Sequence, residues 1–273
     1  MKRMMTNQLE SVRLMERDLN MLKDLSLLGA MSFSQISSRH FENADASTVC
    51  NRLTKLVNAG LVTRFRVGSQ QYQGKAKTIG VIYQITRRGL SKIRNFFPEV
   101  PFRDEPVPLN TASLAHDLLL TDVMRELERR FEGAKVIHGN QLKRQSLDGV
   151  RAPDAIIEYL SGKKIAVELE LTVKSKRRYR HIVTNYRLLP EYEQVLYIVA
   201  NQAIQTTIEG EILGYKPRKG EQKPSTGKFK FLKLQTLNLE NQTMKKELRS
   251  EMKAHHDENK NHLTEEVNEC HYQ

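Results

Sequence analysis

Two short apolar runs joined by a tight turn constrain the fold more than any other feature of the sequence. The first run begins at Pro153-Asp154, and residues 161–164 then supply a Gly-containing turn. The second run, residues 165–171, carries Glu168 and Glu170 two positions apart. Because side chains in a strand alternate between faces, we expect both glutamates on one face and the apolar residues on the other. The pattern predicts a β-hairpin whose acidic face meets Asp154.

The convergence of Asp154, Glu168 and Glu170 indicates a metal site. Three carboxylates repel one another unless a cation lies between them, and hard divalent cations such as Mg²⁺ take oxygen ligands of this kind. Glutamates on alternate positions more often form a solvated face, which is the alternative. The run Lys174-Ser175-Lys176-Arg177-Arg178 favours the metal site. Carboxylates that hold a metal beside cations that hold phosphate suit metal-assisted cleavage of a phosphodiester.

The charge of the chain indicates a polyanionic partner. Its 273 residues carry a net charge of +12, which favours nucleic acid over an anionic membrane surface. No apolar run approaches the roughly 18 residues of a spanning helix, and no signal peptide is recognised. We therefore expect no membrane insertion and a cytoplasmic location. Cys50 and Cys270 are expected to be free thiols, and no Cys and His pairs occur at zinc spacing.

Hydrophobic periodicity predicts an α+β or mixed α/β fold in four parts. Residues 1–98 are expected to form three helices and then a hairpin, the order of a winged helix-turn-helix DNA-binding domain. Residues 99–110, rich in proline, read as a linker or an extended strap. Residues 111–237 are expected to form a mixed α/β domain. The expected elements are a helix over about 111–131, strands over 135–142, 154–160, 165–171 and 195–200, a helix over 176–189, and an edge strand over 229–234. Residues 238–273 are charged and are expected to be largely disordered or helical.

The third predicted helix and the hairpin after it carry most of the candidate DNA contacts. Polar side chains opposite the apolar stripe of the helix suit base edges and phosphates in a major groove, and hairpin cations suit the DNA backbone. A protein-interaction domain that never touches DNA is the alternative. The candidate DNA-binding residues are Ser47, Thr48, Asn51, Arg52, Lys55, Arg64, Arg66, Lys75 and Lys77, together with Lys176, Arg177 and Arg178 of the second domain.

The hairpin motifs resemble the core of the restriction-endonuclease-like, or PD-(D/E)xK, nucleases. Pro153-Asp154 and Glu168-Leu169-Glu170 fill that pattern, except that Glu170 replaces the common lysine. The role of Glu170 is therefore open between metal ligand and base, and Lys174 could supply the missing cation. Together with the winged helix and Leu114-Ala115-His116-Asp117-Leu118, the motifs are similar to the replication-relaxation family, and within it to the MobC-type relaxases of mobilisable plasmids, over roughly residues 15–200.

This resemblance implies a metal-dependent relaxase that nicks one strand of double-stranded DNA at an origin of transfer and then holds single-stranded DNA. Asp154, Glu168 and Glu170 would bind Mg²⁺ or Mn²⁺, and His116 and Lys174 would complete the catalytic site. An accessory mobilisation protein or a coupling protein would be a further partner. The nucleophile is left open between water and a tyrosine, and Tyr159, Tyr179 and Tyr186 lie close in sequence to the site. Two other functions also stay open, a non-enzymatic replication initiator or regulator and a two-strand endonuclease of a mobile element.

Overall fold

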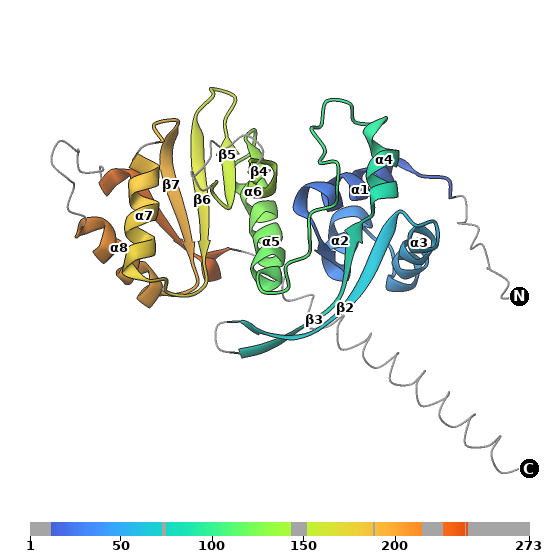
Figure 1. The fold of residues 1–273 in the computed structure, drawn as a ribbon, viewed down its shortest axis with the longest axis horizontal. Coiled ribbons are helices and arrows are strands. Elements are labelled where there is room, and N and C mark those ends of the chain that lie inside the picture. Colours follow the sequence, from blue (N-terminus) through green and yellow to red (C-terminus); the bar gives the residue numbers. More distant parts are fainter. Residues whose placement is uncertain are drawn as a thin grey trace, which may run out of the picture. The chain divides into compact units, whose positions relative to one another are not determined.

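The computed structural model describes residues 12–72, 75–142, 152–187, 189–214, 226–237 and 239 (Figure 1). Helices are combined with one three-stranded and one five-stranded sheet, so the predicted mixed fold class is confirmed. The described residues from 12 to 237 belong to one compact unit. Within the described ranges, no helix has the length and apolar character needed to cross a membrane.

The N-terminal part follows the predicted order of three helices, a hairpin and a further helix. The small strand β1 pairs with β3, which pairs with β2, and all neighbours are antiparallel. Ser32 caps the second helix by accepting a hydrogen bond from the backbone N–H of Gln35. The elements are α1 (Glu16–Leu28), β1 (Met31–Ser32), α2 (Phe33–His40), α3 (Ala46–Asn58), β2 (Val62–Tyr72), β3 (Lys75–Ile85) and α4 (Arg87–Arg94).

The proline-rich segment crosses the surface of this N-terminal part. Residues 101–110 contain no helix or strand, but they are tied down at several points. Gln84 donates a side-chain hydrogen bond to the carbonyl oxygen of Val107, and Arg87 forms an ion pair with Glu105. The segment is therefore an extended strap, one of the two forms expected from the sequence.

The second part contains a five-stranded sheet in the order β4-β5-β6-β7-β8. The first three strands are antiparallel and the last three are parallel. Strand β8 confirms the edge strand expected near Phe229, whereas the sequence reading did not foresee helix α8. The elements are α5 (Leu114–Arg130), β4 (Lys135–His138), α6 (Gly139–Leu142), β5 (Ala155–Glu158), β6 (Lys164–Glu170), α7 (Lys176–Arg187), β7 (Tyr192–Val199), α8 (Gln202–Leu213) and β8 (Phe229–Lys233).

Helices α7 and α8 share one core with the sheet. Tyr179 and Ile182 of α7 and Ile204 of α8 are buried together with Ala166 of β6 and Tyr197 of β7. Ala166, Glu168 and Glu170 alternate along β6, so they share this face. The acidic face of β6 is therefore turned toward α7.

Helix α5 is fastened to α2 along its length. The side-chain amide of Gln35 donates to the carbonyl oxygen of Leu118 and to the carboxylate of Asp122, both at 2.7 Å. Arg125 donates to the hydroxyl of Ser38 at 2.7 Å and to its carbonyl oxygen at 3.0 Å. These contacts, which we call the α2–α5 clamp, join the helix-hairpin part of the chain to the helix that carries His116.

Candidate active site

Asp154 lies at the acidic end of β6. Strand β5 pairs antiparallel with β6, and Ala155 faces Val167. One residue before that pair, the carboxylate of Asp154 accepts a hydrogen bond of 2.9 Å from the backbone N–H of Leu169. The hairpin thus brings the Pro-Asp motif beside the two glutamates.

Gly139, which was not predicted to be important, holds the Pro153-Asp154 motif in place. The backbone N–H of Gly139 donates to the carbonyl oxygen of Asp154 at 2.8 Å. A Cβ atom at Gly139 would lie 2.4 Å from the carbonyl oxygen of Pro153, so only glycine permits this approach. The strand expected over residues 135–142 ends at His138, where the chain turns into α6 at this glycine. A glycine inside a strand pattern is a known signal of close backbone approach.

His116, in the first turn of α5, reaches the same place. Its Nε2 lies 3.2 Å from the carbonyl oxygen of Leu169 and 3.5 Å from Oδ2 of Asp154, and its Nδ1 lies 3.2 Å from Oδ1 of Asp117. Since both nitrogens face oxygen acceptors, both are donors and the ring carries a proton on each. Burial alone would lower the pKa of His116, but hydrogen bonds to Asp117 and Asp154, with their charges, raise it to about 10. In this arrangement His116 is a cation at neutral pH.

Glu168 is buried against helix α7. Only 1% of the residue is exposed, and the hydroxyl of Tyr186 donates to Oε1 at 2.5 Å. Burial, together with the charge of Glu168, raises the pKa of Tyr186 well above its ordinary value. Lys228 in turn donates to the carbonyl oxygens of Tyr186 and Leu189 at 2.8 and 3.2 Å, which fixes the end of α7. Glu168 is therefore not part of a solvated face.

Glu170 is paired with a cation from the same chain segment. It is 1% exposed, and the ammonium of Lys174 forms an ion pair with its Oε1. The backbone N–H of Lys174 donates to the hydroxyl oxygen of Tyr179 at 3.0 Å, which holds the segment after β6 against α7. Lys174, which follows the end of β6, thus places its positive charge beside Glu170, the last acidic residue of the motif.

Two of the three tyrosines near the motif are enclosed. Tyr179 and Tyr186 are buried at 1% and 2% exposure, and the hydroxyl of each has a hydrogen-bond partner. Tyr159, on the far side of the hairpin turn, packs its ring edge-on against Phe131 at 6.4 Å between centroids. In this arrangement neither Tyr179 nor Tyr186 is accessible to DNA.

The three carboxylates do not fit a divalent metal as they are arranged. In the described part of the chain, no group of three or more His, Cys, Asp or Glu side chains is placed to hold a metal ion. Asp154 contacts a charged imidazole, Glu168 a phenol and Glu170 an ammonium. In this arrangement, His116 and Lys174 place positive charge beside Asp154 and Glu170. A requirement for Mg²⁺ or Mn²⁺ stays a prediction.

The candidate phosphate contacts at the start of α7 are open to solvent. Lys176, Arg177 and Arg178 are all exposed and directly follow Lys174. The ammonium of Lys176 lies 3.9 Å from the carboxylate of Glu211, a long ion pair at the surface. These side chains lie next in sequence to the motif, with no helix or strand between them.

On α3, only part of the predicted polar face is available to contact DNA. Asn51 and Lys55 are exposed, as are Thr54 and Asn58, which the sequence reading did not include. Ser47 and Thr48 are also exposed, but their hydroxyls donate to Asp45 at 2.6 and 3.0 Å, so they help to cap the helix. Cys50, on the same helix, is exposed and is a free thiol.

Arg52 is not a free reader of base edges in this structure. Its guanidinium donates to the carboxylate of Asp18, which is fully buried in α1, and to the carbonyl oxygen of Arg13 at 2.8 Å. Asp18 also accepts from the backbone N–H of Met15 at 2.7 Å. Arg52 therefore ties α3 to α1, because a buried carboxylate requires a charged partner.

The β2–β3 hairpin contributes two of the predicted DNA-binding cations whose side chains the structure describes. Arg64 and Arg66 lie on one face of β2 and are exposed. Phe65 and Val67, on the other face, pack with the first turns of α5. The side chains of Lys75 and Lys77 lie outside what the structure describes, as do Cys270 and the predicted tail.

Comparison with known proteins gives one extensive match. A family model described as "Replication-relaxation" matches residues 20–197. No curated protein matches the chain. A solved structure of the restriction endonuclease FokI is 12% identical, with a TM-score of 0.24, over 74% of this chain and 41% of that one. The chain thus spans less than half the length of that enzyme.

Proposed function

Because the chain belongs to the replication-relaxation family, we propose that it is a DNA nickase, a relaxase that cuts one strand at an origin of transfer. Membership of the family indicates a role in DNA replication or relaxation. The net charge of +12 agrees with a nucleic-acid partner. The nicking reaction, the origin and the accessory partners belong to the proposal.

The observation that carries the proposal is the meeting of His116 with Asp154 at the end of the acidic strand. Cleavage of a phosphodiester needs stabilisation of charge on the phosphate and a proton for the leaving oxygen. His116, held as a cation and with 29% of its side chain exposed, is suited to both roles. Lys174 and the cations at the start of α7 are suited to hold the flanking phosphates. The enclosure of Tyr179 and Tyr186 favours water as the nucleophile.

The requirement for a metal is a separate part of the proposal. Carboxylate oxygens have the right chemistry for Mg²⁺ or Mn²⁺, but each carboxylate here is engaged with another side chain. The proposed reaction is therefore tested with and without Mg²⁺ or Mn²⁺. Nicking in EDTA at the rate seen with either ion would remove the metal from the proposal.

Recognition of the origin is assigned to the helix-hairpin part as a winged helix. The exposed polar side chains of α3, among them Asn51 and Lys55, would enter the major groove. Arg64 and Arg66 of the hairpin would follow the DNA backbone. This assignment is supported by the element order and by the exposure of these side chains.

The test is a nicking assay with the full chain and supercoiled plasmid that carries its native locus, in Mg²⁺, Mn²⁺ or EDTA. We expect open circles whose DNA ends carry no protein. Asp154→Asn and His116→Gln should lower the nicking rate by about 100-fold or more, while duplex binding is kept. Lys163→Gln, a surface change in the hairpin turn, should nick like the natural chain.

Three results would contradict this function in different ways. Linear DNA as the first product would favour the two-strand endonuclease. Duplex binding without cleavage under every metal condition would favour the initiator or regulator. Protein that stays attached to one DNA end, and is released by protease, would keep the nickase but replace water by a tyrosine.

A further inference from the structure

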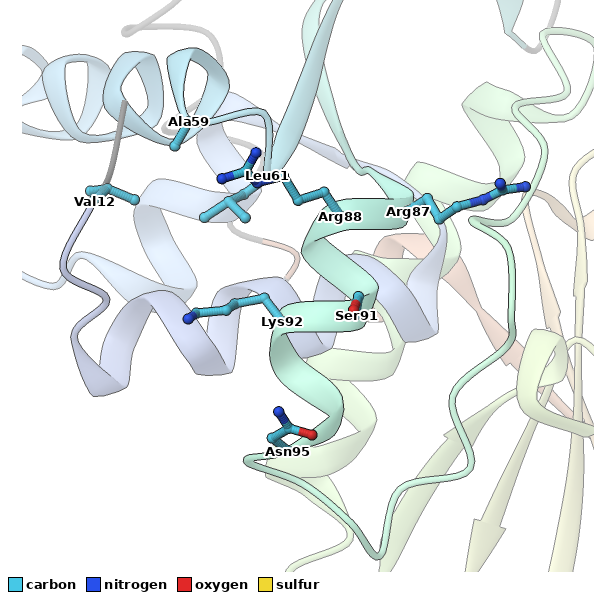
Figure 2. Close-up of a pocket in the computed structure, with 8 residues that line it drawn as sticks. All are labelled: Val12, Ala59, Leu61, Arg87, Arg88, Ser91, Lys92 and Asn95. Atoms are coloured by element: carbon cyan, nitrogen blue, oxygen red, sulfur yellow. The ribbon is translucent and has the colours of Figure 1, made fainter. Parts of the chain in front are cut away.

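A basic pocket lies between the end of α3 and the outer face of α4. Its volume is about 750 Å³, and Val12, Ala59 and Leu61 form its apolar side. Arg88 and Lys92, one helical turn apart on α4, line the other side (Figure 2). None of these residues belongs to the candidate site described above.

The cationic side chains of α4 differ in whether they have an acidic partner. Arg87 pairs with Glu105, and Arg94 donates to Asp104 at 2.9 Å, so the strap neutralises both. Arg87 also lines the pocket, but Figure 2 shows its side chain extending to the opposite side of α4 from Arg88 and Lys92. Among the residues that the structure describes, no carboxylate pairs with Arg88 or Lys92. Within the described residues, two charges without an ionic partner therefore face the pocket.

The pocket is held in shape by a close backbone contact. A Cβ atom at Gly89 would lie 2.3 Å from the carbonyl oxygen of Leu61, so α4 rests directly on the start of β2. The hydroxyl of Thr86 donates to the carbonyl oxygen of Gly60 at 2.7 Å and accepts from the backbone N–H of Gly89 at 3.0 Å. The cationic side chains are thus carried by a fixed helix and not by a loop.

We propose that this pocket binds phosphates of the DNA backbone beyond the segment read by α3. Asn58, the last residue of α3, is exposed, and the next residue, Ala59, already lines the pocket. A duplex whose major groove holds α3 would therefore have backbone near the pocket. Ser91 and Asn95 add a hydroxyl and an amide that can donate to phosphate oxygens. This inference rests on the proposed DNA-binding function and extends it to α4.

The test compares salt dependence of duplex binding by fluorescence anisotropy, with the full chain and a random-sequence duplex. The double variant Arg88→Gln/Lys92→Gln should reduce the slope of log K against log salt by about 1.8, since each phosphate contact contributes about 0.9. Arg94→Gln, on the same helix but paired with Asp104, should change the slope by much less. Thermal unfolding of all three proteins checks that they are equally folded.

The alternatives give different results. An unchanged slope in the double variant, while the natural chain binds DNA, would overturn the pocket and leave the proposed function standing. If the double variant loses binding to polyglutamate but binds duplex DNA normally, the pocket is a site for an acidic peptide. That result would overturn the proposal that the pocket binds DNA phosphates. Absence of duplex binding by the natural chain would overturn both this inference and the proposed function.

Discussion

At the scale of single residues, His116 shows how neighbouring hydrogen-bond acceptors set the protonation state of an imidazole. An imidazole between acceptors on both nitrogens is stabilised as a cation, and here the acceptors are two carboxylates and a backbone carbonyl. A charged imidazole cannot take up a proton, so His116 in this arrangement is a proton donor or a phosphate contact. In the proposed reaction, the role of base would then fall to a carboxylate.

The charge of His116 should appear in the pH dependence of stability. The pKa of His116 is raised from an ordinary value of 6.5 to about 10, so its stabilising contribution is complete below about pH 6.5 and is lost as pH rises toward 10. We expect the difference in unfolding free energy between the natural chain and His116→Gln to shrink over that range. Urea unfolding in EDTA measures it. A difference that stays constant from pH 6 to 10 would indicate a neutral ring.

Arg52 should act on stability more than on sequence discrimination. Arg52→Ala leaves the carboxylate of Asp18 buried without its charged partner, which typically costs about 3–5 kcal/mol. Lys55→Ala, an exposed change on the same helix, should stay within about 0.5 kcal/mol. Urea unfolding curves of both variants measure these values. A loss of DNA specificity in Arg52→Ala with unchanged stability would restore Arg52 as a base reader.

These residues mark the limit of what could be predicted at this scale. Alternation correctly put Glu168 and Glu170 on one face, because side-chain direction in a strand is a local property. The partner of Arg52 is in another helix, 34 positions away in the chain, and the apolar stripe of α3 contains no sign of it. Tyr186 and its bond to Glu168 were likewise set by the packing of α7, which no local pattern specifies.

At the scale of elements, the β5–β6 hairpin was predictable and its surroundings were not. Both strands are short apolar runs with a Gly-containing turn between them, so their pairing follows from sequence. The predicted strand over residues 135–142 was too long, because α6 begins where Gly139 meets Asp154. Helix α8 was missed, although Ile204, Ile208 and Ile212 are buried at helical spacing.

Gly139 provides a test of how tightly the elements hold the motif. Gly139→Ala puts a methyl group 2.4 Å from the carbonyl oxygen of Pro153, so the Asp154 backbone must shift. A misplacement of about 1 Å can reduce rates about 100-fold, and we expect a loss of nicking of that order. Gly210→Ala, in α8 with open space around it, should leave nicking unchanged and stabilise the chain by about 0.5–1 kcal/mol. Equal nicking rates in both variants would show that Asp154 tolerates the shift.

At the scale of the whole molecule, the α2–α5 clamp would determine how the proposed DNA binding and the proposed cutting are related. Gln35 and Ser38 of α2 bond to the helix that carries His116 at its first turn, and Arg39 adds a longer contact to Glu128 at 3.4 Å. The proposed DNA reader and the candidate active site are thus connected by side-chain bonds and not by the strap alone. The division into domains at residues 98 and 110 stays a prediction.

The clamp predicts a fixed offset between the bound sequence and the nick. If about five base pairs, half a helical turn, are inserted between them, we expect the nick to move with the footprint of the protein. Nick mapping and nuclease footprinting on the same substrates measure both positions. A nick that stays at its original bond while the footprint moves would show that the two parts act independently.

A fixed offset also bears on how such a protein changes its target during evolution. The exposed residues of α3 can be substituted without disturbing Gln35, Ser38 or the helix that they hold. A variant that reads a new sequence would therefore inherit a functional cleavage site at the same distance from it. New origins would become accessible through changes on one helix face, and the catalytic residues would not need to change with them.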